Sequence, residues 1–180
     1  LCTTTTMAEV PLDCTYVSKE DVVGSGRLGI CSCPGAKRGG LHGTREMEAD
    51  IVSLTQAGVT DLYTLTPKSE MRRLKVEGLH EAVQAAGIAW HYFPCEDGLY
   101  PAEDQMPELV KSIIGSVETG RSCMVHCRGG MGRAVTAVAV VLAEMAPSRP
   151  MEEIINRLRA LRGNGAVQTV KQYNFLNEYG

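Results

Sequence analysis

The decisive stretch of this sequence runs Met124-Val125-His126-Cys127-Arg128-Gly129-Gly130-Met131-Gly132-Arg133. Its apolar beginning belongs to a predicted short strand, Ser122–His126, and an Ala- and Val-rich helix is predicted from about Gly132 to Met145. Three glycines within four residues separate the two elements, which favours a tight turn. A strand, a glycine turn and a helix in this order are typical of an α/β fold.

The rest of the chain continues this alternation of strands and helices. Alternating or β-branched residues predict strands, and apolar residues three and four positions apart predict helices. The predicted strands cover residues 14–18, 27–33, 59–65 and 88–93, and the predicted helices cover residues 47–57, 67–86, 107–117, 150–161 and 167–179. We therefore predict an α/β fold, with a single domain and a mostly parallel central sheet flanked by helices. Residues 1–11 are predicted to form a flexible leader and residues 12–180 the domain.

The composition is that of one globular domain, with 180 residues, 44% of them hydrophobic and 22% charged. The net charge is −3 and no block of like charges occurs, which argues against nucleic-acid binding across the whole surface. The longest apolar run, residues 134–146, contains Glu144 and is too short to span a bilayer. No signal peptide is recognisable at the first residues. From the net charge and the length of the apolar run, we predict neither a nucleic-acid partner nor a membrane span.

The cysteines are seven in number and scattered, which does not suit a disulfide scaffold in a chain of this length. We expect reduced thiols, as in the cytoplasm or the nucleus. Because His and carboxylate partners at ligand spacing are not found, we predict no metal and no cofactor.

The glycine turn is predicted to bind an anion. Backbone N–H groups at a helix start lack intrahelical partners, and glycines allow a close approach to a ligand. The helix dipole favours the thiolate form of Cys127, and Arg133, six positions later, offers a planar fork for two phosphate oxygens. Two alternatives to a catalytic phosphate loop exist. One is a buried cysteine beside an ordinary glycine turn, and the other is a dinucleotide site, whose G-x-G-x-x-G spacing is missing. The whole pattern favours phosphoryl chemistry on Cys127.

The same residues resemble a known family. Residues 126–133 are similar to the His-Cys-x-x-Gly-x-x-Arg signature of the cysteine-based protein tyrosine and dual-specificity phosphatases. Within that superfamily, the chain looks most like the kinase-associated phosphatases of the cyclin-dependent kinase inhibitor type. The closer resemblance rests on residues 27–31 with Pro34-Gly35, on the loop from Pro94 to Asp97-Gly98, on the signature itself, and on residues 158–163 and 166–174.

The resemblance implies a protein-tyrosine-phosphatase-like fold and specific roles at the site. Cys127 would be the nucleophile that forms a phosphocysteine, and Arg133 would hold the phosphoryl group. His126 would order the loop and keep the thiolate pKa low, without transferring protons. Gln168 and Gln172, four residues apart on a predicted helical face, would position the water that hydrolyses the intermediate. The phosphate oxygens would be bound by the loop residues Arg128, Gly129, Gly130, Met131, Gly132 and Arg133.

Cleavage of a phosphate ester also needs an acid that protonates the leaving oxygen. Asp97 precedes Gly98 in a polar loop that follows a predicted strand, and this loop is similar to the general-acid loop of the family. Glu96 and Asp104 are competing carboxylates nearby. We predict Asp97 as the general acid, against the ordinary fate of a solvated loop carboxylate.

Two positions depart from the pattern of the resembled family. Ala134 stands where a serine or threonine usually stabilises the departing thiolate, so we expect slow breakdown of the phosphocysteine. Thr136, two residues along the helix, should face elsewhere and not replace that hydroxyl. Arg128 adds a cation beside the loop and would favour a more anionic substrate, unless it is simply a solvated surface residue.

These observations predict a phosphoprotein phosphatase of dual specificity, acting on tyrosine and on serine or threonine phosphates. The predicted partner is a phosphorylated protein, and the resemblance implies a cyclin-dependent-type kinase. A phosphatase of inositol phospholipids or inositol phosphates is one alternative, although only Arg128 joins Arg133 in the loop. A catalytically weak phosphate-binding partner of a kinase is another, favoured by Ala134, while sulfur transfer or arsenate reduction would not need Asp97.

Overall fold

The computed structural model describes residues 11–36 and 47–179. Its centre is a five-stranded sheet with the strand order β1-β2-β5-β3-β4. All neighbouring strands are parallel except β1, which pairs antiparallel to β2. The strands are β1 (Thr15–Tyr16), β2 (Arg27–Cys31), β3 (Asp61–Thr64), β4 (Ala89–Tyr92) and β5 (Ser122–His126). The predicted α/β fold with a mostly parallel sheet is confirmed.

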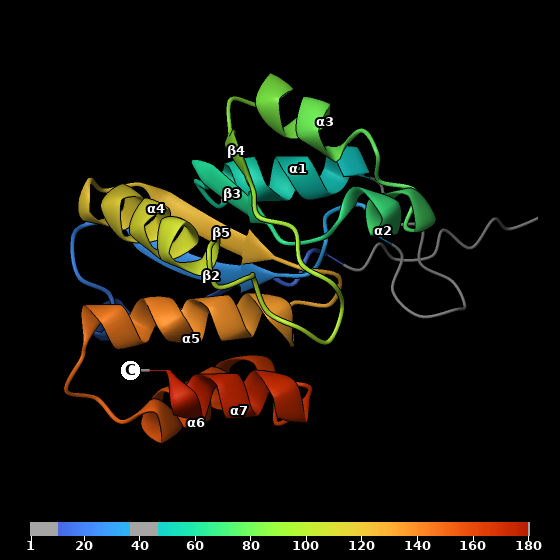
Figure 1. Cartoon of the computed structure of the whole chain (residues 1–180). Coiled ribbons are helices and arrows are strands. Elements are labelled where there is room, and N and C mark those ends of the chain that lie inside the picture. The colour runs from blue at the N-terminus through green and yellow to red at the C-terminus, as the bar shows by residue number, and fades with distance from the viewer. Residues whose placement is uncertain (1–10, 37–46, 180) are drawn as a thin grey trace, which may run out of the picture.

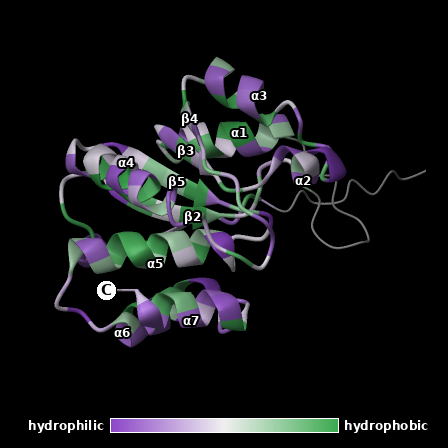
Figure 2. Ribbon diagram, viewed as in Figure 1, coloured by the Kyte–Doolittle hydropathy of each residue, from purple (hydrophilic) through white to green (hydrophobic). Residues whose placement is uncertain are grey.

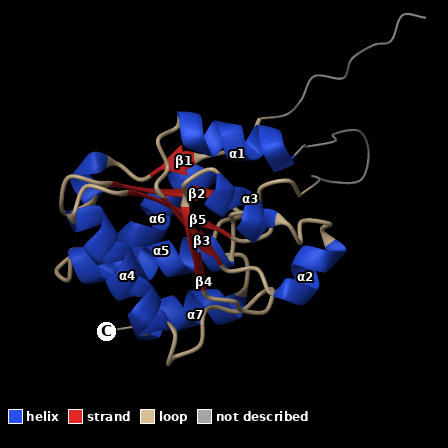
Figure 3. Ribbon diagram, turned by 90° about the horizontal axis from the view of Figure 1, so that it is seen from above, coloured by secondary structure: helices blue, strands red, loops and turns tan. Residues whose placement is uncertain are grey.

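Helices cover both faces of this sheet (Figure 1, Figure 3). The helices α4 and α5 pack on one face, and α6 and α7 pack on the outer side of α5, whereas α1 and α3 cover the other face. A short 3₁₀ helix, η1 (Lys19–Asp21), follows β1. The α-helices are α1 (Met47–Gln56), α2 (Lys68–Arg73), α3 (Leu79–Ala85), α4 (Met106–Glu118), α5 (Arg133–Met145), α6 (Met151–Arg162) and α7 (Val170–Glu178).

Among the helices, α5 is the most deeply buried. Its residues from Arg133 to Leu142 are all buried, and Figure 2 shows it largely in the hydrophobic colour. A helix that is apolar all round belongs inside a protein, here between the sheet and the pair α6 and α7. The start of α5 is therefore fixed by packing on several sides, which places the preceding loop firmly.

The strand β5 lies between β2 and β3 and ends level with both. Cys31 pairs with His126 in one ladder, and Thr64 pairs with His126 in the other. The connections after β3 and β5 therefore leave the sheet at the same edge, and they lead into α2 and α5 (Figure 1). Ligand sites of open α/β sheets form at such carboxyl ends of parallel strands.

Two predicted helices differ in detail from the structure. The stretch 67–86 forms two helices, α2 and α3, because Lys75 adopts a left-handed conformation (φ +57°) between them. The last helix begins at Val170, three residues later than predicted. Residues 1–10 of the predicted leader lie outside the described residues. In the described parts of the chain, no helix is long and apolar enough to cross a membrane.

Candidate active site

The loop between β5 and α5 turns its carbonyl groups away from its interior. Four of them accept hydrogen bonds from backbone or side-chain donors elsewhere in the fold: Arg128 from Cys33 N–H, Gly129 and Gly130 from Arg162, and Met131 from Val167 N–H. In a trans peptide the C=O and the following N–H point in opposite directions. The N–H groups of residues 129–132 therefore point into the loop, as a cradle for an anion requires.

Gly130 shows why this loop needs glycine. Its backbone is left-handed (φ +65°), and a Cβ there would lie 2.6 Å from the carbonyl oxygen of Cys31. Any side chain would push the loop away from β2. For Gly130, one of the glycines predicted from sequence to bind phosphate, the structural cause is thus the close approach of the loop to the sheet.

The side chain of Arg162 ties the back of the loop to the first strand. Its guanidinium donates to the carbonyls of Gly130 (3.0 Å) and Gly129 (3.3 Å). It also donates to the Asp13 carbonyl (2.8 Å) and carboxylate (3.0 Å) and to the Thr15 hydroxyl (3.1 Å). Because five acceptors share one buried cation, the loop is held in shape before any ligand arrives.

The candidate nucleophile Cys127 sits at the base of the cradle and is only 3% exposed. Its neighbour His126 is completely buried, and burial lowers the pKa of the imidazole to about 4. The imidazole is therefore neutral near pH 7. It contacts the Thr64 hydroxyl through Nε2 (2.8 Å) and the Cys127 carbonyl through Nδ1 (3.4 Å). An ordering role of His126 stays a prediction, and these two contacts support it.

Arg133 points its guanidinium into the same space and is held by a residue that the sequence did not reveal. Glu70 of α2 accepts two hydrogen bonds from it, at 2.7 and 3.0 Å, in a buried bidentate pair. Burial opposes the charge, but Glu70, Cys127 and Asp97 outweigh it and raise the pKa of Arg133. Among the described residues, none accepts from the buried Arg133 Nε. This orphan donor suits an anionic oxygen bound in the cradle.

The loop that carries Asp97 reaches over Arg133. The Asp97 carboxylate lies 3.2 Å from Arg133 Nη2, and the Cys95 carbonyl accepts from Nη1 at 3.1 Å. The Asp97 side chain is 60% exposed, in contrast to the buried guanidinium. The structure thus brings the predicted acid to the phosphate loop, 30 residues before the nucleophile in sequence. Glu96 and Asp104, the competing carboxylates, are exposed.

The two glutamines meet the loop at Gly132, although not as predicted. A Cβ on Gly132 would lie 2.7 Å from Gln168 Oε1 and 3.0 Å from Gln172 Nε2. Gln168 precedes α7, so the two residues do not share a helical face. A left-handed turn at Val167 (φ +61°) carries Gln168 over the loop instead.

Gln172 is fixed by several protein contacts. Its side chain completes a capping box with Thr169 at the start of α7. Its Oε1 also accepts from Gln168 N–H at 3.0 Å, and its Nε2 donates to the Leu99 carbonyl at 2.7 Å. Gln172 therefore joins α7 to the acid loop, and a role for either glutamine in positioning water stays a prediction.

Comparison with known proteins identifies the family of this site. A family model described as Cyclin-dependent kinase inhibitor 3 (CDKN3) matches residues 5–155. The chain belongs to the cyclin-dependent kinase inhibitor 3 family. It is 31% identical over 171 residues to Cyclin-dependent kinase inhibitor 3 of Homo sapiens, which covers 95% of this chain and 80% of that protein.

Solved structures place this member of the cyclin-dependent kinase inhibitor 3 family among the phosphatases. A kinase associated phosphatase, crystallised with its catalytic site cysteine substituted by serine, matches with a TM-score of 0.89 at 30% identity over 96% of each chain. PTPMT1 and human DUSP28 share the fold, with TM-scores of 0.68 and 0.62 at 17% and 18% identity. The chain is a cysteine-dependent phosphatase, as the signature predicts.

The two departures noted in the sequence take clear positions in this family member. Ala134 is fully buried in the first turn of α5. The Thr136 hydroxyl donates to the Gly132 carbonyl at 3.0 Å, so it is engaged within its own helix, as expected. Arg128 is exposed, whereas its carbonyl is held by Cys33. In the described residues, no three His, Cys, Asp or Glu side chains gather into a metal site.

Proposed function

We propose that this phosphatase hydrolyses phosphotyrosine and phosphothreonine or phosphoserine in proteins through a phosphocysteine on Cys127. The observation that carries the proposal is that the loop carbonyls accept hydrogen bonds from donors outside the loop. This leaves a ring of N–H donors facing the thiol. Arg133 adds a buried guanidinium with an orphan Nε donor beside this ring. A nucleophile, a cradle for three oxygens and a charge clamp converge on one tetrahedral anion.

The first step transfers the phosphoryl group to sulfur. The Cys127 thiolate attacks phosphorus in line with the ester oxygen, so a P–S bond forms as the P–O bond breaks. Asp97, beside Arg133, donates its proton to the departing oxygen. Arg133 and the loop N–H groups stabilise the charge on the three equatorial oxygens throughout.

The second step returns the enzyme to its starting state. Water attacks the phosphocysteine, Asp97 takes its proton, and the thiolate departs with the S–P electron pair. We propose that Gln168, whose Oε1 lies next to Gly132, accepts a hydrogen bond from that water. Because Ala134 offers no hydroxyl to the departing thiolate, we expect this step to limit turnover.

The names of the relatives supply the proposal for a partner. The human relative is called Cyclin-dependent kinase inhibitor 3, and the solved relative a kinase associated phosphatase. We propose that a phosphorylated kinase of the cyclin-dependent type is the protein substrate. An Asp97→Ala variant, in which Cys127 and Arg133 stay intact, should capture such a kinase in its phosphorylated form and release it to free phosphate.

A substrate panel tests the chemistry directly. Phosphotyrosine and phosphothreonine peptides should be hydrolysed by the wild type, and Cys127→Ser should abolish both activities. Faster hydrolysis of soluble inositol phosphates or phosphoinositide vesicles than of both peptides would contradict the protein substrate. Activity that survives in Cys127→Ser would contradict the phosphocysteine.

A further inference from the structure

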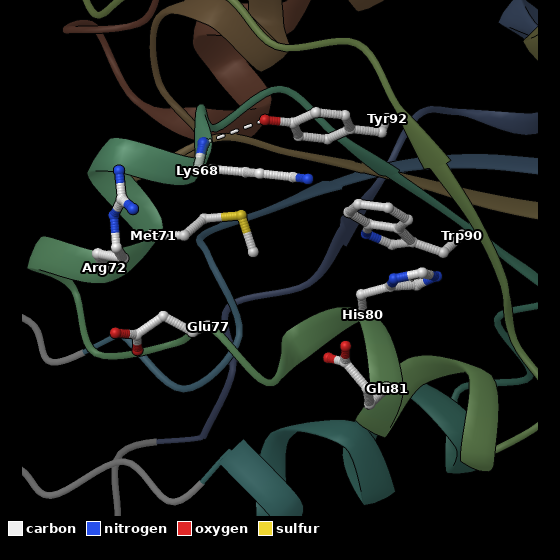
Figure 4. A pocket seen from close by; sticks show the side chains of 8 residues that line it. All are labelled: Lys68, Met71, Arg72, Glu77, His80, Glu81, Trp90 and Tyr92. Carbon is white, nitrogen blue, oxygen red and sulfur yellow. Dashed lines mark hydrogen bonds between the residues drawn. The ribbon is translucent and has the colours of Figure 1, made fainter.

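A pocket of about 410 Å³ lies between α2, α3 and β4 (Figure 4). Trp90 forms one wall, stacked between His80 and Tyr92 with ring centroids 4.0 and 5.0 Å away. The pocket is lined by Lys68, Met71, Arg72, Glu77, His80, Glu81, Trp90 and Tyr92. None of these residues belongs to the phosphate loop, but hydrogen bonds connect the indole of Trp90 to that loop.

A chain of three hydrogen bonds connects Trp90 to the nucleophile. The Trp90 indole N–H donates to Thr64 Oγ1 at 2.7 Å, and Thr64 Oγ1 lies 2.8 Å from His126 Nε2. His126 Nδ1 then lies 3.4 Å from the Cys127 carbonyl oxygen. Thr64 and His126 are both fully buried, so water does not compete for these groups.

The chemistry of the donors fixes the direction of every bond. An indole nitrogen can only donate and a carbonyl oxygen can only accept. Thr64 Oγ1 accepts from Trp90 and keeps its own proton for His126 Nε2, which must then be the bare nitrogen. The imidazole proton sits on Nδ1 and points at the Cys127 carbonyl. Only this tautomer satisfies all four groups, and the low pKa of His126, caused by its burial, keeps the ring neutral.

We propose that Thr64 and Trp90 are positioning residues for the nucleophile, because they select the His126 tautomer that holds the Cys127 peptide. The inference rests on the proposed function, in which Cys127 is the nucleophile. The Cys127 carbonyl and the Arg128 N–H belong to one peptide unit and point in opposite directions. If His126 turned a lone pair toward that carbonyl, the peptide would rotate and take the Arg128 N–H away from the cradle.

The test compares Thr64→Val, which keeps shape and loses the hydroxyl, with Thr64→Ser, which keeps the hydroxyl. The readout is the pH dependence of Cys127 alkylation by iodoacetate, together with kcat on a phosphotyrosine peptide. Thr64→Val should move the alkylation midpoint up by about one pH unit and lower kcat about tenfold. Thr64→Ser should restore both values, and Trp90→Phe should shift them in the same direction by less.

A purely structural role would give a different result. The Thr64→Val preparation would then contain a smaller fraction of folded protein, while the pH midpoint of Cys127 alkylation stayed at the wild-type value. This outcome would overturn the inference. Tyr92→Phe is the matched control, since its hydroxyl accepts from Lys68 N–H and stands outside the chain of bonds. It should leave the midpoint unchanged. Cys127→Ser separates the two proposals, because activity in that variant refutes the proposed function itself.

Fluorescence gives a second and independent readout. Trp90 is the single tryptophan of the chain, so its emission reports on this pocket alone. Inorganic phosphate bound in the cradle should change the emission of the wild type, and the change should vanish in Thr64→Val. Equal changes in both proteins, at phosphate concentrations that saturate both, would show that the chain of bonds does not link the pocket to the loop.

A separate observation concerns two thiols, Cys14 directly before β1 and Cys31 at the end of β2. The antiparallel register pairs Thr15 with Ile30 and Tyr16 with Gly29, and its continuation sets Cys14 opposite Cys31. Val17 N–H donates to the Leu28 carbonyl, so Val17 and Leu28 form a hydrogen-bonded pair. Because such pairs alternate, Cys14 and Cys31 form a non-hydrogen-bonded pair, in which Cα atoms lie roughly 4.5 Å apart. A disulfide fits this spacing, and the two side chains already share a hydrogen bond.

We infer that Cys14 and Cys31 form a reversible cross-strand disulfide when a peroxide is present. Burial and the hydrogen bond from Cys14 raise the pKa of Cys31, and Cys31 is fully buried, so the partly exposed Cys14 reacts first. Its thiolate takes one oxygen from hydrogen peroxide, giving a sulfenic acid and hydroxide. Cys31 sulfur then displaces the hydroxyl group, and its proton leaves with that group as water. The two sulfurs lose two electrons in total, and the peroxide gains them.

Peptide mapping tests the disulfide in a Cys127→Ser background, where the candidate nucleophile cannot be oxidised. After hydrogen peroxide and alkylation, a linked peptide should join Cys14 to Cys31, and dithiothreitol should release it. Cys14→Ser should prevent the link, whereas Cys123→Ser should not. A link between Cys31 and Cys33 instead, or alkylation of Cys14 and Cys31 as thiols after peroxide has oxidised other cysteines, would overturn the inference.

Discussion

The phosphate loop and the acid loop face each other across Arg133, but they are held in very different ways. The phosphate loop is built into the core: Cys127 and Arg133 are buried, and Arg162 binds the loop from behind. The acid loop exposes 60% of the Asp97 side chain and is contacted by the side chains of Arg133, Thr169 and Gln172. Changes in the first loop should therefore affect folding and catalysis together, and changes in the second should affect catalysis alone.

The largest expected effect without a cost in folding belongs to Asp97→Asn. Loss of general acid catalysis should lower kcat about 10² to 10⁴-fold on a substrate with a poor leaving group. The free energy of unfolding should stay within about 0.5 kcal/mol of the wild type, because the side chain is mostly exposed. Steady-state kinetics and urea unfolding measure the two quantities. A comparable loss of stability would erase the contrast between the loops.

Glu70→Gln, in contrast to Asp97→Asn, should lower both kcat and the free energy of unfolding. It removes one charge from a buried bidentate pair and leaves the Arg133 guanidinium uncompensated. The free energy of unfolding should fall by about 3 kcal/mol, and kcat should fall at least tenfold. Glu96→Gln, on an exposed carboxylate of the acid loop, is the matched control and should change neither. A Glu70→Gln protein of wild-type stability would show that the pair does not hold the loop.

Acid should weaken the fold through His126. Burial lowers its pKa to about 4 from the ordinary 6.5, so the unfolded chain binds a proton before the folded one as the pH falls. The stabilisation is complete above pH 6.5 and is lost between pH 6.5 and 4, which amounts to about 2 kcal/mol between pH 7.5 and 5. Urea unfolding at these two pH values should show a larger drop for the wild type than for His126→Asn. Parallel drops would assign the acid sensitivity to other groups.

The smallest effect is expected for Ala134→Ser, which adds the hydroxyl that the related signature carries. A hydrogen bond to the departing thiolate, worth about 1 kcal/mol, should speed the hydrolysis of the phosphocysteine roughly fivefold. Single-turnover and burst kinetics separate this step from phosphoryl transfer. An equal or slower rate would show that Ala134 does not limit the second step.

The sequence predicted the parts of the site that are local. The pattern of residues 126–133 predicts a strand end, a turn and a helix start within eight positions. Asp97 directly precedes Gly98 in a short loop. The residues that hold these parts come from far away in the chain. Glu70 precedes Arg133 by 63 positions, Arg162 follows Gly130 by 32, and Thr64 precedes His126 by 62.

Such distant pairings carry no periodic signal, because any surface glutamate or arginine looks the same in sequence. Glu70 in particular sits between the cations Lys68 and Arg72 of a short helix, where a solvated carboxylate would be expected. The register of the sheet decides which of these side chains meet, and that register is set by the whole core. The helical face predicted for Gln168 failed for a related reason, since a left-handed turn at Val167 replaced the expected first helical turn.

Detection of the intermediate tests the central claim most directly. The wild type, incubated with excess phosphotyrosine peptide and quenched in acid within milliseconds, should carry one phosphoryl group. Peptide mapping should place that group on Cys127, with the larger part of the enzyme in this form because its breakdown is slow. Cys127→Ser, handled identically, should carry none on sulfur. Wild-type turnover without phosphate on Cys127, or phosphate on another residue at the same rate in both proteins, would contradict the account.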